Sequence, residues 1–245
     1  MIKVSVVGAK GRMGSHVVEA VNNAEDTQLA LALDAGDDLT QITTDNTDVV
    51  VEFTVPSVSL NNVLTLIGQG VDVVVGTTGW TDEKLAQVKS AIANGPKPET
   101  QKVFIAPNFA ISAVLADYFA TKAAKYFESA EVIELHHPTK VDAPSGTALM
   151  IADAAAGACG HETEYVFERH SVRHPRDKKE IGISAVRGGT IVGEHEIIFA
   201  GHDEVMEIRH TALSREIFAQ GAVEAAKFMA GVKAPGLYDM SSLIR

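Results

Sequence analysis

The chain opens with the stretch that decides its fold, Ile2-Lys3-Val4-Ser5-Val6-Val7-Gly8-Ala9-Lys10-Gly11-Arg12-Met13-Gly14. Residues 2–7 are mostly β-branched and predict a buried strand that ends at Gly8. A helix is expected directly afterwards, because Met13, Val17 and Val21 share one helical face. A glycine-rich turn at this place brings backbone N–H groups to a helix start, where the helix dipole favours a pyrophosphate. The turn therefore predicts dinucleotide binding, although its spacing is G-x-x-G-x-x-G and not G-x-G-x-x-G.

The second predicted strand, residues 29–33, ends at Asp34. An acidic side chain at this position can hydrogen-bond an adenosine ribose hydroxyl. Lys10 and Arg12 lie within the glycine turn, where their charges would suit a 2′-phosphate instead. Because these two signals conflict, we expect the protein to accept both NADH and NADPH. The alternative is a glycine turn in a domain that binds nothing, with Lys10 and Arg12 as solvated surface charges.

Short strands alternate with helices as far as Pro107, a pattern that predicts a parallel sheet built from βαβ units. Strands are expected at residues 29–33, 49–53, 71–75 and 103–106, and helices at 13–21, 58–67 and 82–93. Two further turns follow strand ends, where ligands gather in such sheets. Gly76-Thr77-Thr78 could hold the nicotinamide ribose, and Ala106-Pro107-Asn108-Phe109 could hold the carboxamide. The alternatives are a plain turn and a hinge.

The rhythm changes after Pro107. A helix at 113–126 and a strand at 132–135 precede a long polar loop at 160–180, and strands then follow each other at 181–186, 191–199 and 205–208, before a last helix at 217–229. We therefore predict an α/β protein. It has an N-terminal Rossmann-like parallel-sheet domain and a smaller α+β domain with a mixed or antiparallel sheet.

Composition excludes several functions. The 245 residues include 21 Lys and Arg against 32 Asp and Glu, a formal net charge of −11, so nucleic acid and anionic membranes are poor partners. The single cysteine, Cys159, cannot form an intramolecular disulfide. No apolar run reaches the roughly 18 residues of a transmembrane helix, and residues 4–7 are too short a run for a signal peptide. We therefore expect a cytoplasmic location.

The densest chemistry lies in Glu134-Leu135-His136-His137-Pro138-Thr139-Lys140-Val141-Asp142-Ala143-Pro144-Ser145-Gly146-Thr147-Ala148. Its prolines block a helix, so the segment is a shaped loop, and Ser145-Gly146-Thr147 precedes a helical run that could bind a carboxylate. Three interpretations compete. A metal site is disfavoured, because His136 and His137 would point apart in an extended chain; a structural loop with surface histidines is the second. The third is an acid–base site, because His titrates near neutrality and Lys140 can donate a proton.

This string resembles the signature of the dihydrodipicolinate reductase family, which reduces 4-hydroxy-tetrahydrodipicolinate in the diaminopimelate route to lysine. The resemblance spans the chain, from the glycine turn to Leu237-Tyr238-Asp239-Met240. It implies that His136 is the proton donor and acceptor and Lys140 a second proton donor. The implied substrate contacts are His137, Ser145, Gly146, Thr147 and, less securely, Arg215. The expected cofactor contacts are Gly8, Ala9, Lys10, Gly11, Arg12, Met13, Asp34, Gly76, Thr77, Thr78, Ala106, Pro107, Asn108 and Phe109.

The resemblance also implies a small dicarboxylate substrate and a homotetramer assembled through the second domain's sheet. From the residues themselves, we expect no metal. Residues 1–108 and 217–245 are expected to form the dinucleotide-binding domain, and residues 109–216 the substrate-binding and oligomerisation domain. Two other functions stay open. One is a different two-domain amino-acid or imino-acid dehydrogenase, and the other is a nucleotide-sensing protein without catalysis.

Overall fold

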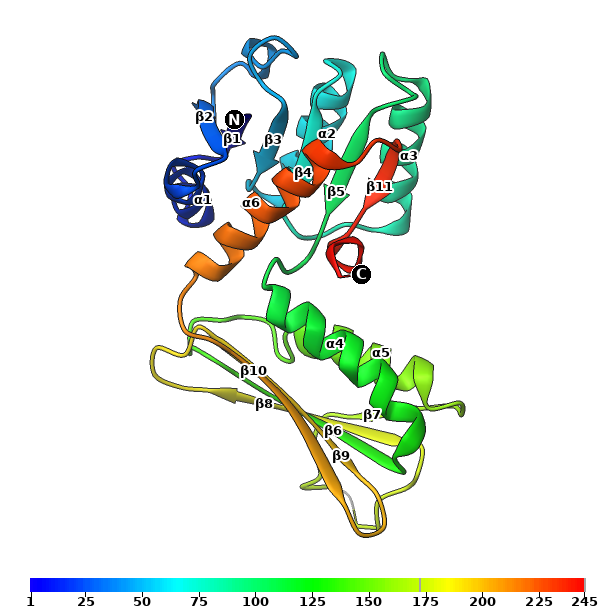
Figure 1. The fold of residues 1–245 in the computed structure, drawn as a ribbon. Helices are drawn as coiled ribbons and strands as arrows, with labels where there is room; N and C mark the ends of the chain where they lie inside the picture. The colour runs from blue at the N-terminus through cyan, green and yellow to red at the C-terminus, as the bar shows by residue number, and fades with distance from the viewer. Residues whose placement is uncertain (172, 245) are drawn as a thin grey trace. The chain divides into compact units, whose positions relative to one another are not determined.

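The computed structural model describes residues 1–171 and 173–244, which form two compact units (Figure 1). The first unit comprises Met1–Phe109 and Arg215–Arg245, and the second comprises Ala110–Ser214. These boundaries lie one or two residues from those that the sequence suggested. Phe109 belongs to the first unit because its ring packs 5.8 Å from that of Phe53 and 5.9 Å from that of Phe104.

The first unit is a six-stranded parallel sheet in the order β11-β5-β4-β3-β1-β2. Its strands are β1 (Ile2–Val7), β2 (Thr27–Leu33), β3 (Val49–Glu52), β4 (Asp72–Val75), β5 (Lys102–Ile105) and β11 (Gly236–Tyr238). The sheet forms because its central strands are runs of buried valines, as expected of strands covered on both faces. The predicted Rossmann-like parallel sheet is thus confirmed.

Helices cover both faces of this sheet. They are α1 (Arg12–Asn23), α2 (Pro56–Gly68), α3 (Asp82–Asn94) and α6 (Glu216–Gly231), with short 3₁₀ turns at Leu39–Gln41 and Met240–Leu243. The pair α1 and α6 packs on one face, and the pair α2 and α3 packs on the other (Figure 1). Helix α6 and β11 therefore bring the C-terminal residues onto the first half of the chain. The sequence did not predict β11, whose three residues are too few for a periodic pattern.

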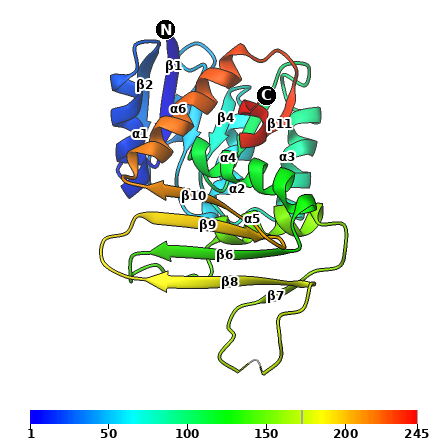
Figure 2. The same cartoon turned by 60° about the horizontal axis from the view of Figure 1, so that its bottom comes forward.

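The second unit is a five-stranded mixed sheet in the order β10-β9-β6-β8-β7 (Figure 2). Its strands are β6 (Ser129–His136), β7 (Glu164–Val166), β8 (Glu180–Arg187), β9 (Gly193–Ala200) and β10 (Val205–Ala212). Strand β9 runs antiparallel to β6 and β10, whereas β8 runs parallel to β6 and β7. The predicted mixed sheet is confirmed, but the prediction of a structureless loop at 160–180 is wrong, because β7 lies within it.

Two helices, α4 (Ile111–Ala123, followed by a 3₁₀ turn at Ala124–Tyr126) and α5 (Gly146–Ala158), pack on one face of this sheet. Alanines on both helices let them approach each other and the strands closely, over Val132, Ile183, Ile197 and Phe199. Strand β6 alternates strictly, so Ala130, Val132, Glu134 and His136 all point to this covered face. The polar end of β6 thus continues the same row as its apolar core.

Candidate active site

The glycine turn owes its composition to close backbone approaches. Gly8 has a φ of +86°, and a Cβ there would lie 2.1 Å from the carbonyl oxygen of Phe53. A Cβ on Gly14 would lie 1.9 Å from the carbonyl oxygen of Gly8. Gly11 precedes α1 and supplies no side-chain cap for its first N–H groups. The turn therefore leaves a helix start open to an anion, which fits the pyrophosphate of a dinucleotide.

Asp34 closes β2 beside this turn. Its carboxylate accepts hydrogen bonds from the backbone N–H of Ala35, at 2.7 Å, and from that of Lys10. These two bonds hold the pKa of the Asp34 carboxyl below its usual value, so the group is an anion at neutral pH. Lys10 and Arg12 are exposed in the same turn. The signals for a free ribose hydroxyl and for a 2′-phosphate therefore lie side by side.

The remaining predicted cofactor contacts follow β4 and β5, so they lie at the same carboxyl-terminal edge of the parallel sheet. The Thr77 hydroxyl is buried and accepts the N–H of Thr54 at 2.7 Å, which ties this turn to the end of β3. Phe109 is buried in an aromatic cluster, so only its backbone is placed to touch a ligand. All members of the predicted set follow the carboxyl ends of strands in this one parallel sheet, and their contact with a cofactor stays a prediction: Gly8, Ala9, Lys10, Gly11, Arg12, Met13, Asp34, Gly76, Thr77, Thr78, Ala106, Pro107, Asn108 and Phe109.

A cavity of ≈ 500 Å³ opens at this edge, where β4, β5 and β11 end. Thr78 and Pro107 line it together with Trp80 and Tyr238. The Trp80 indole donates to the carbonyl oxygen of Thr77 at 2.8 Å, which fixes the ring in the wall. This volume and its largely apolar lining are typical of small-molecule sites.

The polar stretch joins the end of β6 to the start of α5, within the second unit. Its centre is Glu134, which is completely buried, and His136, which is 8% exposed. The two side chains point the same way because they are two residues apart on a strand. Nδ1 of His136 lies 2.6 Å from Oε2 of Glu134. The buried Glu134 carboxylate therefore holds the His136 imidazole, for which the sequence predicts acid–base chemistry.

Arg187, at the end of β8, completes this pair. Its Nη1 and Nη2 atoms each donate to one Glu134 oxygen, both at 2.7 Å. Burial alone would raise the pKa of the Glu134 carboxyl, but the bonds from Arg187 and His136 outweigh it and hold that pKa below its usual value. Burial lowers the pKa of His136, and the bond to Glu134 opposes this only in part. At neutral pH, the cluster thus holds an ionised Glu134 and a neutral His136.

Lys140 is linked to the same cluster through Asp142. Its Nζ donates to both carboxylate oxygens of Asp142 at 2.8 Å, and Arg187 donates to the Asp142 carbonyl oxygen at 2.7 Å. Burial would raise the pKa of Asp142, but the bond from Lys140 outweighs it, so this carboxyl also stays ionised. The Lys140 ammonium is therefore held beside an anion, 22% exposed.

The start of α5 is built on the same carboxylate. The backbone N–H of Ser145 donates to Oε1 of Glu134 at 3.0 Å, and the Ser145 hydroxyl caps the helix by accepting the Ala148 N–H at 3.1 Å. Gly146 and Thr147 form the first turn of the helix, at the positive end of its dipole. This is a suitable place for a substrate carboxylate.

Of the predicted residues, His136 and Ser145 contact the Glu134 carboxylate directly, and Gly146 and Thr147 follow Ser145 in the first turn of α5. Lys140 contacts Asp142, whose carbonyl oxygen accepts from Arg187. His137 lies at the beginning of the loop, with its Nδ1 2.7 Å from the Thr139 hydroxyl. Arg215 belongs to the first unit, directly before α6, and its predicted contact with substrate stays a prediction.

Sequence reasoning gave no role to Glu134, Arg187 or His195. Glu134 was recognisable, since a strand places it on the same face as His136. Arg187 and His195 reach the site only through strand pairing, which sets His136 beside Arg187 and Glu134 beside His195. The His195 ring is buried, with its Nε2 atom 2.9 Å from the Ser145 hydroxyl and its centroid 5.2 Å from that of His136.

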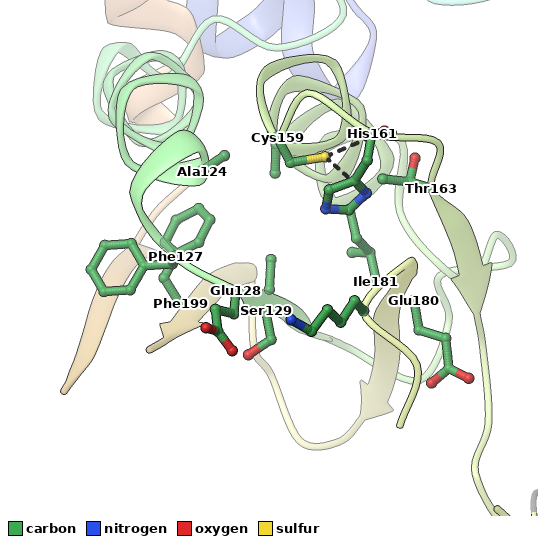
Figure 3. Close-up of a pocket in the computed structure, with 13 residues that line it drawn as sticks. Ala124, Phe127, Glu128, Ser129, Cys159, His161, Thr163, Glu180, Ile181 and Phe199 are labelled. Carbon is green, nitrogen blue, oxygen red and sulfur yellow. Dashed lines mark hydrogen bonds between the residues drawn. The ribbon is translucent and has the colours of Figure 1, made fainter. Parts of the chain in front are cut away.

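The only cysteine of the chain lies away from this cluster, at the end of α5 (Figure 3). Its thiol donates to the Ala156 carbonyl at 3.1 Å and lies 3.9 Å from Nδ1 of His161. The cavity beside it measures only ≈ 20 Å³, room for about one water molecule. In the described part of the chain, no three His, Cys, Asp or Glu side chains converge as a metal site requires.

Solved structures show which class of protein shares this fold. An aspartate dehydrogenase from Thermotoga maritima, 12% identical, superposes with a TM-score of 0.51 over 94% of this chain and 97% of its own. That likeness concerns the fold alone. A glycine turn on a parallel sheet, joined in one chain to a second unit with a mixed sheet, is the two-domain plan expected of a nicotinamide-dependent oxidoreductase.

Family models for the N-terminus and the C-terminus of dihydrodipicolinate reductase match residues 2–109 and 112–244. The chain belongs to the dihydrodipicolinate reductase family. A 4-hydroxy-tetrahydrodipicolinate reductase from Bifidobacterium longum (strain NCC 2705) is 70% identical over 241 residues, covering 97% of this chain and 96% of the relative. One from Mycobacterium sp. (strain KMS) is 41% identical over 249 residues, covering 96% of each.

A dipicolinate-bound dihydrodipicolinate reductase from Paenisporosarcina sp. TG-14 has a TM-score of 0.80 and is 28% identical, covering 97% of this chain and 98% of its own. The resemblance that the polar stretch suggested is thereby confirmed. The chain is an NAD(P)H-dependent oxidoreductase of lysine biosynthesis through diaminopimelate, acting on 4-hydroxy-tetrahydrodipicolinate. No helix within residues 1–171 and 173–244 is long and apolar enough to span a bilayer.

Proposed function

We propose that the cluster around Glu134 is the centre at which this chain reduces 4-hydroxy-tetrahydrodipicolinate, with His136 and Lys140 as its acid–base pair. One observation carries the proposal. An imidazole, an ammonium and a capped helix start are joined through the Glu134 and Asp142 carboxylates and Arg187, within one short loop and two strand ends. The imidazole and the ammonium can transfer protons, and the helix start can bind a carboxylate of the substrate.

The cofactor fits the first unit on the geometry of its turn. Gly8, Gly11 and the start of α1 would hold the pyrophosphate, Asp34 with Lys10 and Arg12 would hold the adenosine end, and Gly76–Thr78 with Ala106–Phe109 would hold the nicotinamide end. Reduced nicotinamide supplies a hydride. Because turn residues of both signs surround the adenosine end, we propose that NADH and NADPH are both used.

The protein's own part is to bind, orient and transfer protons. The 4-hydroxyl of the substrate takes up a proton and leaves as water, while the ring carbon between C4 and the imine carbon gives up a proton to a base, which gives a conjugated imine. Hydride addition at C4 then leaves an enamine, which takes up one proton to give tetrahydrodipicolinate. His136 and Lys140 are the donors beside this position, and His137, Ser145, Gly146, Thr147 and Arg215 are proposed to hold the two carboxylates. Orientation of this kind contributes up to ~7–11 kcal/mol in ideal cases.

The dicarboxylate assignment is supported by chemistry at both ends of the loop. The start of α5 presents the positive end of its dipole to one carboxylate, and Lys140 offers a cation to the other. The related enzyme from Paenisporosarcina sp. TG-14 is described with dipicolinate, a planar dicarboxylate of the same ring size. A net charge of −11 makes a general cationic surface an inadequate explanation, so the placed groups must provide the affinity.

The deciding experiment mixes the purified protein with freshly prepared 4-hydroxy-tetrahydrodipicolinate and follows NADH and NADPH absorbance. We expect turnover with both cofactors and none with aspartate, oxaloacetate plus ammonia, or linear imino acids. Turnover only with a linear imino acid would favour a different dehydrogenase. Tight cofactor binding without any turnover would favour a nucleotide-sensing protein.

We also propose that the protein is a cytoplasmic homotetramer assembled through the second unit's sheet. Helices α4 and α5 cover one face of that sheet, and the other face carries Ile133, Val186, Ile198 and Val205, of which Val186 is 43% and Val205 62% exposed. Burying such apolar side chains favours assembly. Sedimentation equilibrium should give four times the 26.0 kDa chain mass, and Val186→Lys should lower it.

A further inference from the structure

Four hydrogen-bond donors converge on the Glu134 carboxylate. Oε2 accepts Nδ1–H of His136 at 2.6 Å and Nη1 of Arg187 at 2.7 Å. Oε1 accepts the Ser145 N–H at 3.0 Å and Nη2 of Arg187 at 2.7 Å. The residue has no exposed surface, so water does not compete for these positions. Each oxygen is fully used by two donors from different parts of the chain.

This arrangement fixes the tautomer of His136. An ionised carboxylate only accepts hydrogen bonds, so the Nδ1 atom of His136 must carry the proton. The other ring nitrogen, Nε2, then holds the lone pair. It lies over Gly193, where a Cβ would come within 3.0 Å of it. A glycine at this position therefore leaves Nε2 uncovered by a side chain on β9.

Arg187 keeps the carboxylate ionised. A buried, unpaired carboxyl group takes up a proton, because burial disfavours its charged form. The two bonds from the Arg187 guanidinium oppose this, as the bidentate geometry is the strongest available to the pair. Without the guanidinium, a protonated Glu134 could donate to Nδ1 and reverse the tautomer. The Arg187–Glu134 ion pair thus keeps the proton on Nδ1 of His136, in addition to stabilising the fold.

We propose that Glu134 is a positioning residue for the reduction: it holds His136 as the Nδ1–H tautomer and fixes the start of α5 at a set distance from that imidazole. The inference rests on the proposed role of His136. It adds the tautomer in which the ring acts, because Nε2 can then accept a proton from the substrate and later return one. Lys140, whose Nζ donates to both Asp142 oxygens at 2.8 Å, is then the group that first donates.

Glu134→Gln tests this, because the amide cannot satisfy all four donors. The Ser145 N–H cannot change, so the amide oxygen is expected to stay at the Oε1 position. The amide NH₂ then faces His136. Because this NH₂ group only donates, Nδ1 of His136 must lose its proton to accept a hydrogen bond from it. We expect the variant to switch His136 to the Nε2–H tautomer, and to lower kcat by at least ~10²-fold, the low end for a proton-transfer group. The KM for NADH should stay within about twofold.

The direct readout is the ¹⁵N chemical shift of the ring nitrogens, measured on histidine-labelled protein and assigned by comparison with His136→Gln. The second readout is the pH profile of kcat. Glu134, Lys140, Arg187 and His195 are the titratable or charged groups that face His136. Removing the anion lowers the pKa of His136, so the acid limb should move to lower pH. A purely structural role would lower protein yield or stability without moving either readout.

Glu131→Gln is the matched control. Glu131 lies on the same strand, also pairs with an arginine (Arg176, 2.9 Å), and points to the opposite face of the sheet. It should keep the wild-type tautomer and the wild-type profile. Glu134→Asp keeps the charge and should retain the Nδ1–H tautomer with a smaller loss of kcat.

The outcomes separate this inference from the proposed function. Wild-type kcat in Glu134→Gln with an unchanged His136 tautomer would overturn the positioning role. An Nε2–H tautomer in the wild-type protein would overturn it as well, even if Glu134→Gln does not fold. Wild-type turnover in His136→Gln would instead remove His136 from the proposed mechanism, whatever the tautomer measurement gives.

Discussion

The Nε2 atom of His195 lies 2.9 Å from the hydroxyl oxygen of Ser145, so an imidazole on β9 braces the residue that caps α5. Both side chains are almost completely buried. The cap at the start of α5 therefore depends on a strand that is 50 residues away in sequence.

Ser145→Ala removes this cap and leaves His195 unpaired. The lost cap costs about 0.5–2 kcal/mol, and an unsatisfied buried group adds about 1–3 kcal/mol. We expect urea unfolding to show a free energy lower by about 2 kcal/mol or more. Thr81→Ala, at the exposed cap of α3, is the control and should cost less than about 1 kcal/mol. Equal losses would show that the His195 contact contributes nothing.

The histidine row predicts how stability depends on pH. Burial lowers the pKa of His195 to about 3, and it also lowers the pKa of His210, whose ring stacks on that of His195. The unfolded chain then binds protons near pH 6.5 that the folded chain does not. Stability should therefore fall as the pH drops below about 6.5, by up to about 1.4 kcal/mol per pH unit for each histidine.

The window from pH 7 to 5 separates the buried histidines, His136 included, from most carboxylates with lowered pKa values, whose contribution to stability is lost only near and below their ordinary pKa values of about 4. Urea unfolding in this window should give a smaller slope for His195→Gln than for wild type. An identical slope in both proteins would contradict the assignment.

Cofactor choice should respond to single charges in the glycine turn. Asp34→Ala should lower kcat/KM for NADH about tenfold and change that for NADPH less, because the ribose hydroxyl loses its acceptor. Arg12→Ala should do the opposite. For wild type, we expect the two kcat/KM values to differ by less than about a thousandfold, which is ~4 kcal/mol. A larger ratio would contradict dual use.

Trp80 provides a signal for cofactor binding. It is the only tryptophan of the chain and lines the cavity that Thr78 and Pro107 share. Oxidised cofactor should change its emission in a saturable way, and Trp80→Phe should lose the signal while calorimetry still records binding. Binding by calorimetry with no change in wild-type emission would place the nicotinamide elsewhere.

Lys140→Ala should lower kcat by at least ~10²-fold with the Kd for NADH nearly unchanged, because an ammonium near the substrate is lost while the glycine turn is intact. Lys179 is the matched control, since its ammonium also pairs with a carboxylate (Glu162, 3.6 Å) in the same unit. Lys179→Ala should keep wild-type turnover. Turnover near wild type in Lys140→Ala would exclude Lys140 as a proton donor.

Much of the fold followed from periodicity. The continuous valine runs of β3 and β4 indicate strands buried on both faces, and the apolar faces of α1 and α2 are long enough to show the helical period. Strands β7 and β11 have three residues each, and their existence depends on pairing with β8 and β5. Such pairing is a tertiary property that no local pattern reveals.

Some residues of the candidate site are also recognisable from the local sequence, whereas others depend on strand pairing. His136, Lys140 and Ser145 are close in sequence, so a single loop displays them together. Arg187 and His195 join them through strand register, and Glu134 acquires its importance from the donors that meet it. Sequence reasoning found the residues of the proposed site that lie in one loop, and it missed the role of the Glu134 carboxylate that two of them contact.

The pairing of β11 with β5 has a consequence for biosynthesis of the protein. A ribosome that has translated as far as Ser214 has delivered every residue of the second unit, whereas the first unit still lacks α6 and its outermost strand. Until Tyr238 emerges from the ribosome, β5 is an unpaired edge strand, and the valines that α6 covers in the folded protein remain exposed to solvent. The half of the protein that is translated first is thus the half that finishes folding last.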